Sequence, residues 1–366
     1  VARVFKKTSK GGGLTLYLGK RDYVDHTTSV DKVDGVVKLD PAELGDRKVF
    51  CQLACAFRYG SDDLDVMGLC FRKDIWITHV QIYPQVSKPA QTPMHDTLMA
   101  KAGDNAYTFT FEIPNNLPCS VSLQPGPDDN GKACGVDFEV KAYLAKEQDN
   151  PDEKIDKKDT ARLIIRKIQY APSQIGAGPK ADICKSFMMS DKPVHLEASE
   201  TDYYSYFGNI TSSVIPIKIK INNEMEQCTD IVLYSADKYT KVVYCQEFAG
   251  TYENSLSITP LLSENKEKRG LALDGRLKDE DTNLASTTIL KTNIEKDVLG
   301  ILVSYKIKIN LMVAGGGDVT VELPLMLMHP KPEGKYKHKQ IYYTHIFVSC
   351  IYILSLSLNR INTSIL

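Results

Sequence analysis

The chain has 366 residues, more than one ordinary hydrophobic core accommodates, so we expect two domains. Its 45 basic and 46 acidic side chains nearly cancel, and 43% of its residues are hydrophobic. This composition is typical of a globular protein in aqueous solution and argues against a polyelectrolyte that binds nucleic acid. Recognition by charge must therefore depend on local patches.

The first such patch lies at the start of the chain. Between residues 3 and 21 there are six basic side chains and no acidic one: Arg3, Lys6, Lys7, Lys10, Lys20 and Arg21. A cluster of this kind favours an anionic partner.

Nine cysteines are scattered along the chain without the paired spacing of a zinc site, even at Cys51 and Cys55. No signal peptide opens the sequence. We therefore expect reduced thiols in a cytoplasmic protein that holds no metal and no cofactor.

One helix is predicted, between Thr92 and Gly103. Thr92 suits the N-cap, Pro93 the first helical position, and Gly103 the C-terminal end. Apolar residues recur every four positions from Met94, which gives a stripe that would lie on a sheet.

Elsewhere the dominant pattern is alternation of apolar and polar residues. It occurs in four clear segments, residues 107–113, 215–221, 305–311 and 319–325. Such strands bury one face and expose the other, which favours antiparallel sandwiches over a parallel α/β sheet.

Two stretches lack this pattern. Residues 170–180 are rich in proline and glycine and predict a linker. Residues 341–358 are almost wholly apolar and follow a run of lysines, so a membrane anchor is one hypothesis for them. Against it, the segment contains a histidine, three serines and a threonine.

Charged residues also occur where strands should be apolar. Arg166 lies within the apolar segment 163–168, and Asp22 follows residues 17–19 of another strand. If buried, each needs a partner, because an unpaired buried ion is costly. The residues alone favour a simpler interpretation, in which Arg166 or Lys167 points to solvent at a strand edge.

Motifs of catalysis are missing. The chain has no GxSxG elbow, no HExxH, no Walker loop and no GxGxxG after a strand. The glycine runs at 11–13 and 315–317 are not followed by a phosphate-binding helix, so we interpret them as hairpin turns. We expect a binding protein and not an enzyme.

Several long blocks of the chain resemble the arrestin family. They follow the family's order between Arg3 and Pro332: Val4–Lys7, Leu16–His26, Asp34–Val37, Cys55–Asp74, Phe109–Gly126, Gly131–Tyr143, Met189–Ala198 and Glu267–Ser286. Residues 230–240 (DIVLYSADKYT) resemble the cone-photoreceptor arrestins more than the non-visual ones.

The resemblance implies an all-β fold of two immunoglobulin-like sandwich domains joined by a hinge, with one short helix. The expected ranges are 1–169 for the first sandwich, 170–181 for the hinge, 182–332 for the second sandwich and 333–366 for an atypical tail.

The resemblance also implies a function. An arrestin binds an activated, phosphorylated G-protein-coupled receptor, here an opsin, and blocks further coupling to the G protein. It is cytoplasmic, in this case in a photoreceptor cell, and reaches the membrane only through its receptor. Two alternatives stay open: a non-visual arrestin that desensitises and internalises other receptors, and a tail-anchored membrane scaffold.

Particular residues match the family's functional positions. Those that would sense receptor phosphates are Lys6, Lys7, Arg21 and Lys278. Those that would form a buried ionic switch between the domains are Asp22, Arg166, Asp274 and Asp281. Those that would form the loop entering the receptor are Asp65, Val66, Met67, Gly68 and Leu69.

The chain departs from the family pattern beyond Pro332. The only later arginine is Arg360, in a context unlike an arrestin tail, where the family supplies a second arginine to the ionic cluster. Three aspartates around one arginine are unbalanced, so we expect a partly pre-activated protein with relaxed dependence on phosphate. Residues 206–228 and 314–318 are also short relative to the family.

Overall fold

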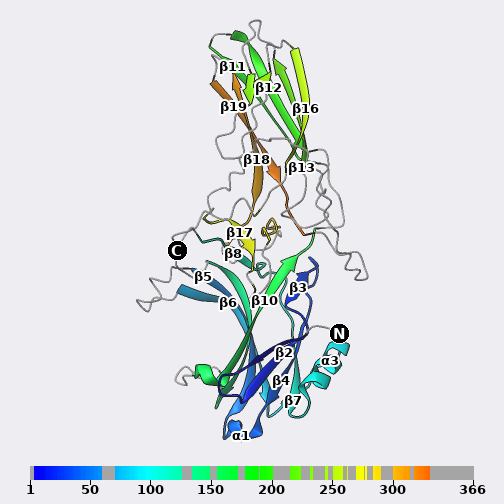
Figure 1. Cartoon of the computed structure of the whole chain (residues 1–366), viewed down its shortest axis with the longest axis vertical. Coiled ribbons are helices and arrows are strands. Elements are labelled where there is room, and N and C mark those ends of the chain that lie inside the picture. Colours follow the sequence, from blue (N-terminus) through cyan, green and yellow to red (C-terminus); the bar gives the residue numbers. More distant parts are fainter. Residues whose placement is uncertain are drawn as a thin grey trace. The chain divides into compact units, whose positions relative to one another are not determined.

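The computed structural model describes the following residues: 4–59, 71–125, 134–148, 155–171, 178–188, 190–200, 215–223, 231–233, 244–245, 250–258, 262, 269–275, 277, 283–289, 300–313 and 317–329. Within them the backbone is mostly β-strand, which confirms the predicted fold class (Figure 1). The chain divides into two compact units, Val1–Tyr170 with Lys266–Leu302, and Ala171–Asn265 with Val303–Leu366.

The first unit contains two sheets that form a sandwich. One has the order β1-β2-β4-β7: β1 (Phe5–Thr8), β2 (Leu14–Leu18), β4 (Val33–Leu39) and β7 (Ala106–Phe111). The other has the order β17-β8-β9-β10-β3: β17 (Ala272–Asp274), β8 (Val121–Leu123), β9 (Gly135–Ala145), β10 (Thr160–Gln169) and β3 (Asp22–Asp25). In this second sheet β5 (Lys48–Tyr59) also pairs with β9, and β6 (Phe71–Tyr83) pairs with β5.

Helix α3 (Pro93–Ala102) forms where it is predicted. The Thr92 hydroxyl accepts a hydrogen bond from the N–H of His95 at 3.2 Å, and Gly103 ends the helix with a φ of 73°. Leu98 and Ala102 pack against Tyr17 of β2, so this strand is buried on both faces. The structure adds a four-residue helix, α1 (Pro41–Leu44), and a 3-10 turn, η1 (Lys157–Asp159), that the sequence analysis did not predict.

One strand pair departs from the antiparallel expectation. β10 pairs with β3 in parallel, in a register that sets Arg166 opposite Asp22 and Gln169 opposite Asp25. The pairing of β10 with β9 ends at Ile165, and its pairing with β3 begins at Arg166. The parallel register brings residues more than 140 positions apart in the sequence into contact.

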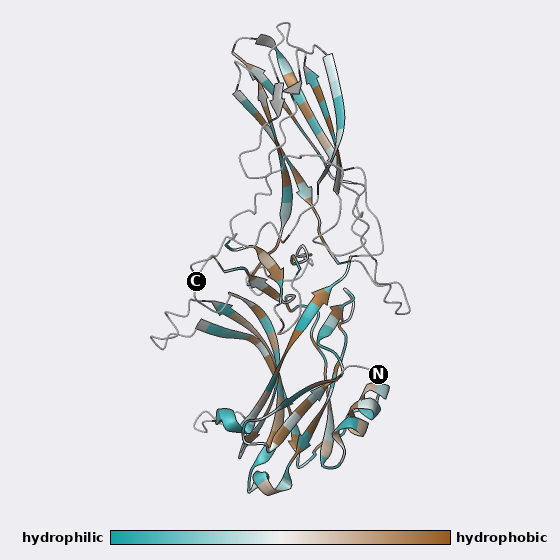
Figure 2. Ribbon diagram, viewed as in Figure 1, coloured by the Kyte–Doolittle hydropathy of each residue, from teal (hydrophilic) through white to brown (hydrophobic). Residues whose placement is uncertain are grey.

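The second unit also has two sheets. One has the order β11-β12-β13-β16: β11 (Lys180–Phe187), β12 (Ser190–Glu200), β13 (Ile215–Asn223) and β16 (Gly250–Ile258). The other has the order β15-β14-β18-β19: β15 (Tyr244–Cys245), β14 (Ile231–Leu233), β18 (Tyr305–Val313) and β19 (Gly317–Leu325). Apolar residues alternate with polar ones along β13, β18 and β19, as predicted and as Figure 2 shows.

Residues 266–302 group with the first unit, although they lie inside the range 182–332 expected for the second sandwich. The physical reason is the pairing of β17 with β8, from Ala272↔Leu123 to Asp274↔Val121. Most of the expected hinge, residues 172–177, lies outside the described residues. The expected domain and tail ranges therefore stay predictions.

Among the cysteines whose side chains the structure describes, five carry free thiols: Cys51, Cys55, Cys119, Cys134 and Cys184. Burial raises the pKa of Cys55 to about 12 and also raises the pKa of Cys51. Both thiols therefore stay protonated and unreactive at neutral pH.

In the part of the chain that is described, no helix combines the length and apolar character needed to cross a bilayer, and the apolar segment 341–358 lies outside that part.

We expect Thr92→Ala to lower the free energy of unfolding by about 1–2 kcal/mol, because it removes the helix cap and the hydrogen bond that Thr92 donates to Asp34 at 3.0 Å. Urea denaturation measures the change. The control is Thr97→Ala on the exposed side of α3, where we expect less than about 0.5 kcal/mol. Equal effects of the two variants would contradict the capping role.

Candidate functional site

Arg166 and Asp22 form a two-pronged ion pair across the parallel strands. The Arg166 Nε donates to Asp22 Oδ1 at 2.6 Å, and its Nη2 donates to Asp22 Oδ2 at 2.9 Å. The Arg166 side chain is 12% exposed and that of Asp22 is 43% exposed. The interpretation that Arg166 points to solvent was therefore wrong: its side chain is largely covered, and the two prongs of the guanidinium are both paired with Asp22.

The backbone around this pair is fixed by Arg21. The N–H of Arg166 donates to the Arg21 carbonyl at 2.7 Å, and the Arg21 Nε donates to the Ile164 carbonyl at 2.9 Å. One bond is donated by β10 and the other by Arg21, the residue before β3. They hold the two strands at the point where the ion pair forms.

The end of β17 lies against Arg166. Asp274 is 7% exposed, and its N–H donates to the Asn283 carbonyl at 2.9 Å. A Cβ added at Gly275 would lie 3.3 Å from the Cγ of Arg166 and 2.8 Å from the Cβ of Ser120. The backbone after Asp274 therefore packs directly on the aliphatic part of Arg166, and a larger residue at position 275 would force one of them to move. Asp281, the fourth predicted member of the cluster, lies outside the described residues.

The predicted phosphate-sensing lysines lie on β1, at the edge of its sheet as far as the described strands extend. Lys6 and Lys7 are both exposed, and the Lys6 ammonium lies 5.7 Å from the centre of the Tyr17 ring. The Arg21 guanidinium lies 5.6 Å from the centre of the Phe5 ring, which joins it to the same strand. Three of the four predicted cations thus belong to one region, while Lys278 and residues 65–69 lie outside the described part of the chain.

The loop after β3 contains an acid that the sequence analysis did not single out. Asp31 accepts hydrogen bonds from Lys20 at 2.6 Å, from His26 at 2.9 Å and from the Val24 N–H at 3.1 Å. Burial alone would raise the pKa of Asp31, but these bonds and the nearby Lys20 charge lower it overall. Asp31 therefore stays ionised and fixes the end of β3.

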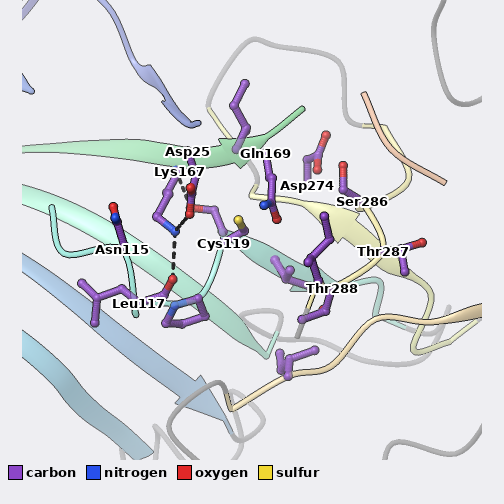
Figure 3. Close-up of a pocket in the computed structure, with 16 residues that line it drawn as sticks. Asp25, Asn115, Leu117, Cys119, Lys167, Gln169, Asp274, Ser286, Thr287 and Thr288 are labelled. Carbon is purple, nitrogen blue, oxygen red and sulfur yellow. Dashed lines mark hydrogen bonds and ion pairs between the residues drawn. The ribbon is translucent and has the colours of Figure 1, made fainter. Parts of the chain in front are cut away.

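A second ion pair, between Lys167 and Asp25, joins the same two strands. The Lys167 ammonium donates to Asp25 Oδ2 at 2.6 Å and to the Leu117 carbonyl at 2.8 Å (Figure 3). The two side chains are 1% and 3% exposed, so the pair is sealed from solvent. The interpretation that Lys167 points to solvent was also wrong, because the strand turns this position toward the interior. The sequence signal was a lysine within an apolar strand, but nothing in the sequence identified its partner.

No group of histidine, cysteine, aspartate and glutamate among the described residues has the arrangement of a metal site. What the region offers is an arginine held by a displaceable carboxylate, with cations on the neighbouring strand. Such an arrangement suits the recognition of an anion.

Comparison with known proteins gives a consistent result. Residues 14–171 match the family "Arrestin (or S-antigen), N-terminal domain". The chain is 53% identical over 354 residues to "Arrestin-C" of Lithobates pipiens, with 90% of each chain covered. It is 50% identical over 359 residues to "Arrestin-C" of Homo sapiens, with 91% of each covered. It is 52% identical over 345 residues to "Beta-arrestin-2" of Homo sapiens, with 90% of this chain and 84% of that protein covered.

The lowered pKa of Asp31 predicts a pH-dependent contribution to stability. A carboxyl with a lowered folded pKa stabilises fully above its unfolded value of 3.8 and loses this effect as the pH falls through the folded value. We expect Asp31→Asn to reduce the free energy of unfolding by about 0.5–1 kcal/mol at pH 7, a modest effect because water screens the group. The difference should shrink as the pH falls below 3.8 and close once the pH is below the lowered folded pKa of Asp31.

Urea denaturation between pH 7 and pH 3 measures this difference. The control is Asp46→Asn, an acid that is 78% exposed, which should change stability by less than about 0.3 kcal/mol. A difference that stays constant across the pH range would rule out the ionised carboxylate as the cause.

Proposed function

Because the chain belongs to the arrestin family, we propose that it binds an activated, phosphorylated G-protein-coupled receptor and prevents further coupling of that receptor to its G protein. The observation that carries this proposal is the pair of Arg166 with Asp22, close to the exposed cations of β1. It acts as a binding protein in the cytoplasm, and the receptor recruits it to the membrane.

Receptor phosphates would first meet the exposed cations. A phosphorylated side chain has a charge of about −1.5 to −2 and three acceptor oxygens. Lys6, Lys7 and Arg21 provide donors near one edge of the first unit, and lysine and arginine side chains are cations at neutral pH. Lys278 matches a fourth position of this kind in the family and is proposed on that basis alone.

The phosphate would then compete with Asp22 for Arg166. Asp22 is 43% exposed, so its side of the ion pair is open to an incoming anion. The fork of a guanidinium binds phosphate as well as it binds carboxylate, and each charge-assisted bond contributes about 1.5–3 kcal/mol. A receptor tail with several phosphates therefore has enough binding energy to exchange the partners.

Movement of Arg166 would loosen the segment that rests on it. Gly275 packs against the Arg166 stem, and the neighbouring Asp274 would face an altered charge once the arginine turns to phosphate. We propose that Asp274, and Asp281 with it, holds the resting state by attracting Arg166. Release of this segment and of the loop at residues 65–69 would allow the loop to enter the activated receptor.

An opsin is the receptor that we propose. The identity to Arrestin-C proteins and the resemblance of residues 230–240 to cone arrestins support it, and they favour a photoreceptor cell as the location. A broader choice of receptors is the second candidate, because the identity to Beta-arrestin-2 is comparable. Binding to purified opsins and to a non-visual receptor, each phosphorylated and activated, separates the two.

The switch predicts the behaviour of Arg166→Glu. The glutamate would repel Asp22 and so break the same ion pair that a receptor phosphate would break. We therefore expect binding to activated but unphosphorylated receptor to rise by about tenfold or more. The control is Arg162→Glu on the same strand. The Arg162 side chain is 53% exposed and lies 4.0 Å from Glu139, at the outer limit of an ion pair, so we expect no rise in receptor binding. Binding of both variants is measured by titration against receptor in lipid nanodiscs. An Arg166→Glu variant that still required receptor phosphorylation for tight binding would contradict the proposal.

A further inference from the structure

The two ion pairs lie on opposite faces of the same pair of strands. Side chains alternate along a strand, so Arg166 and Asp22 share one face of the β10–β3 pair. Lys167 and Asp25 belong to the other face. A single two-stranded ribbon is therefore joined by one ion pair on each side.

The two faces differ in their access to solvent. On one face Asp22 is 43% exposed, whereas on the other Lys167 and Asp25 are 1% and 3% exposed. Lys167 is also held by its surroundings: its N–H bonds the Ser120 hydroxyl at 3.0 Å, and its ammonium bonds the Leu117 carbonyl at 2.8 Å. One carboxylate of the first pair is therefore partly exposed to an incoming anion, whereas both partners of the second pair are buried.

The space beside the buried pair is small. Figure 3 shows Lys167 and Asp25 at a cavity of about 40 Å³, with Gln169 on the same side and Ser286 opposite. At about 10–15 Å³ for each enclosed water, this is room for no more than a few water molecules. A phosphorylated peptide does not fit, so the buried pair is out of reach of the ligand that would open the exposed one.

β3 depends strongly on these contacts. It has four residues, and β10 is its one strand partner in the described part of the chain. Its backbone ladder with β10 and the two bonds of Arg21 also hold it, but a strand this short has few backbone bonds, so loss of both ion pairs would weaken its register.

We propose that Lys167 and Asp25 are positioning residues of the switch: their buried ion pair keeps β3 in register with β10 while phosphate breaks the pair of Arg166 with Asp22. The inference rests on the proposed function, and it explains how the ion pair on one face of the two strands can open while the pair on the other face stays closed. The pair resists opening because separating a buried ion from its partner leaves an uncompensated charge. Asp22 therefore returns to the same place when the phosphate leaves, and the switch is reversible.

The test replaces the buried pair by neutral groups of similar shape, Lys167→Met with Asp25→Asn. A double change leaves no buried charge unpaired, and such replacements are often tolerated. The amide oxygen introduced by Asp25→Asn would keep an acceptor for the Thr27 N–H, which bonds Asp25 at 2.8 Å in the parent. The control is Lys32→Met with Glu112→Gln, an ion pair of the same unit that is 62% and 73% exposed.

Amide hydrogen exchange of residues 22–25 is measured in the full chain, with and without a synthetic peptide bearing three phosphoserines. Without peptide we expect the double variant to exchange as slowly as the parent. With peptide the parent and the control should keep their protection, whereas exchange in the double variant should accelerate by about tenfold or more. Protection that survives in the double variant, or that is already lost without peptide, would overturn the proposal.

A second arm needs no ligand. Asp22→Asn weakens the exposed pair by itself, so residues 22–25 should stay protected in this variant and lose about tenfold in protection when the buried pair is also replaced. Failure of the peptide to bind the parent would refute the proposed function, but the comparison of these variants without peptide would still test the positioning role. Loss of protection in Asp22→Asn alone would overturn the positioning role. Should the double variant fail to fold, Lys167→Gln with Asp25→Asn, which also leaves no buried charge unpaired, provides the same comparison.

Discussion

The parallel register of β3 with β10 is the constraint on which the rest of the site depends. It aligns Asp22 with Arg166 and places Asp25 within reach of Lys167, although the paired residues lie 144 and 142 positions apart in the sequence. Two cations in adjacent positions of one strand must point to opposite faces, so two acids three positions apart on the partner strand can satisfy both. The fold thus accommodates two charges within a sheet without leaving either unpaired.

The difference between the two pairs explains how a stable domain can contain a displaceable contact. An ion pair sealed from water is hard to open, because its separated partners are not solvated. A pair with one exposed carboxylate can exchange that carboxylate for a stronger anion at little cost. Arg166 also packs against Gly275, so the exchange that we propose on the exposed face would reach the segment that contains Asp274. One strand pair therefore combines a fixed contact with a replaceable one.

Part of the fold could be predicted from local patterns, whereas most of the site could not. Helix α3 followed from Thr92, Pro93 and Gly103, and β7, β13, β18 and β19 followed from alternation, because both signals are local. The arrangement of the strands as two sandwiches followed from the resemblance to a family. The parallel pairing of β3, the partner of Lys167 and the contacts of Asp31 depend on residues distant in the chain or on side-chain geometry, which no spacing reveals. The solvent-facing interpretation of Arg166 and Lys167 failed for the same reason, and only the resemblance to a family pointed to Asp22 as the partner.

The proposed switch makes this chain bind a receptor most tightly when activation and phosphorylation coincide. The most direct measurement is pelleting of the purified protein with photoreceptor membranes in four states, dark or illuminated, each with and without phosphorylation of the opsin. We expect the strongest pelleting with illuminated, phosphorylated membranes, where phosphates release Arg166 and an open receptor cavity is present. We expect weaker pelleting with illuminated, unphosphorylated membranes, as for a partly pre-activated protein, and the weakest pelleting in the dark. Equal pelleting in all four states would refute this coincidence.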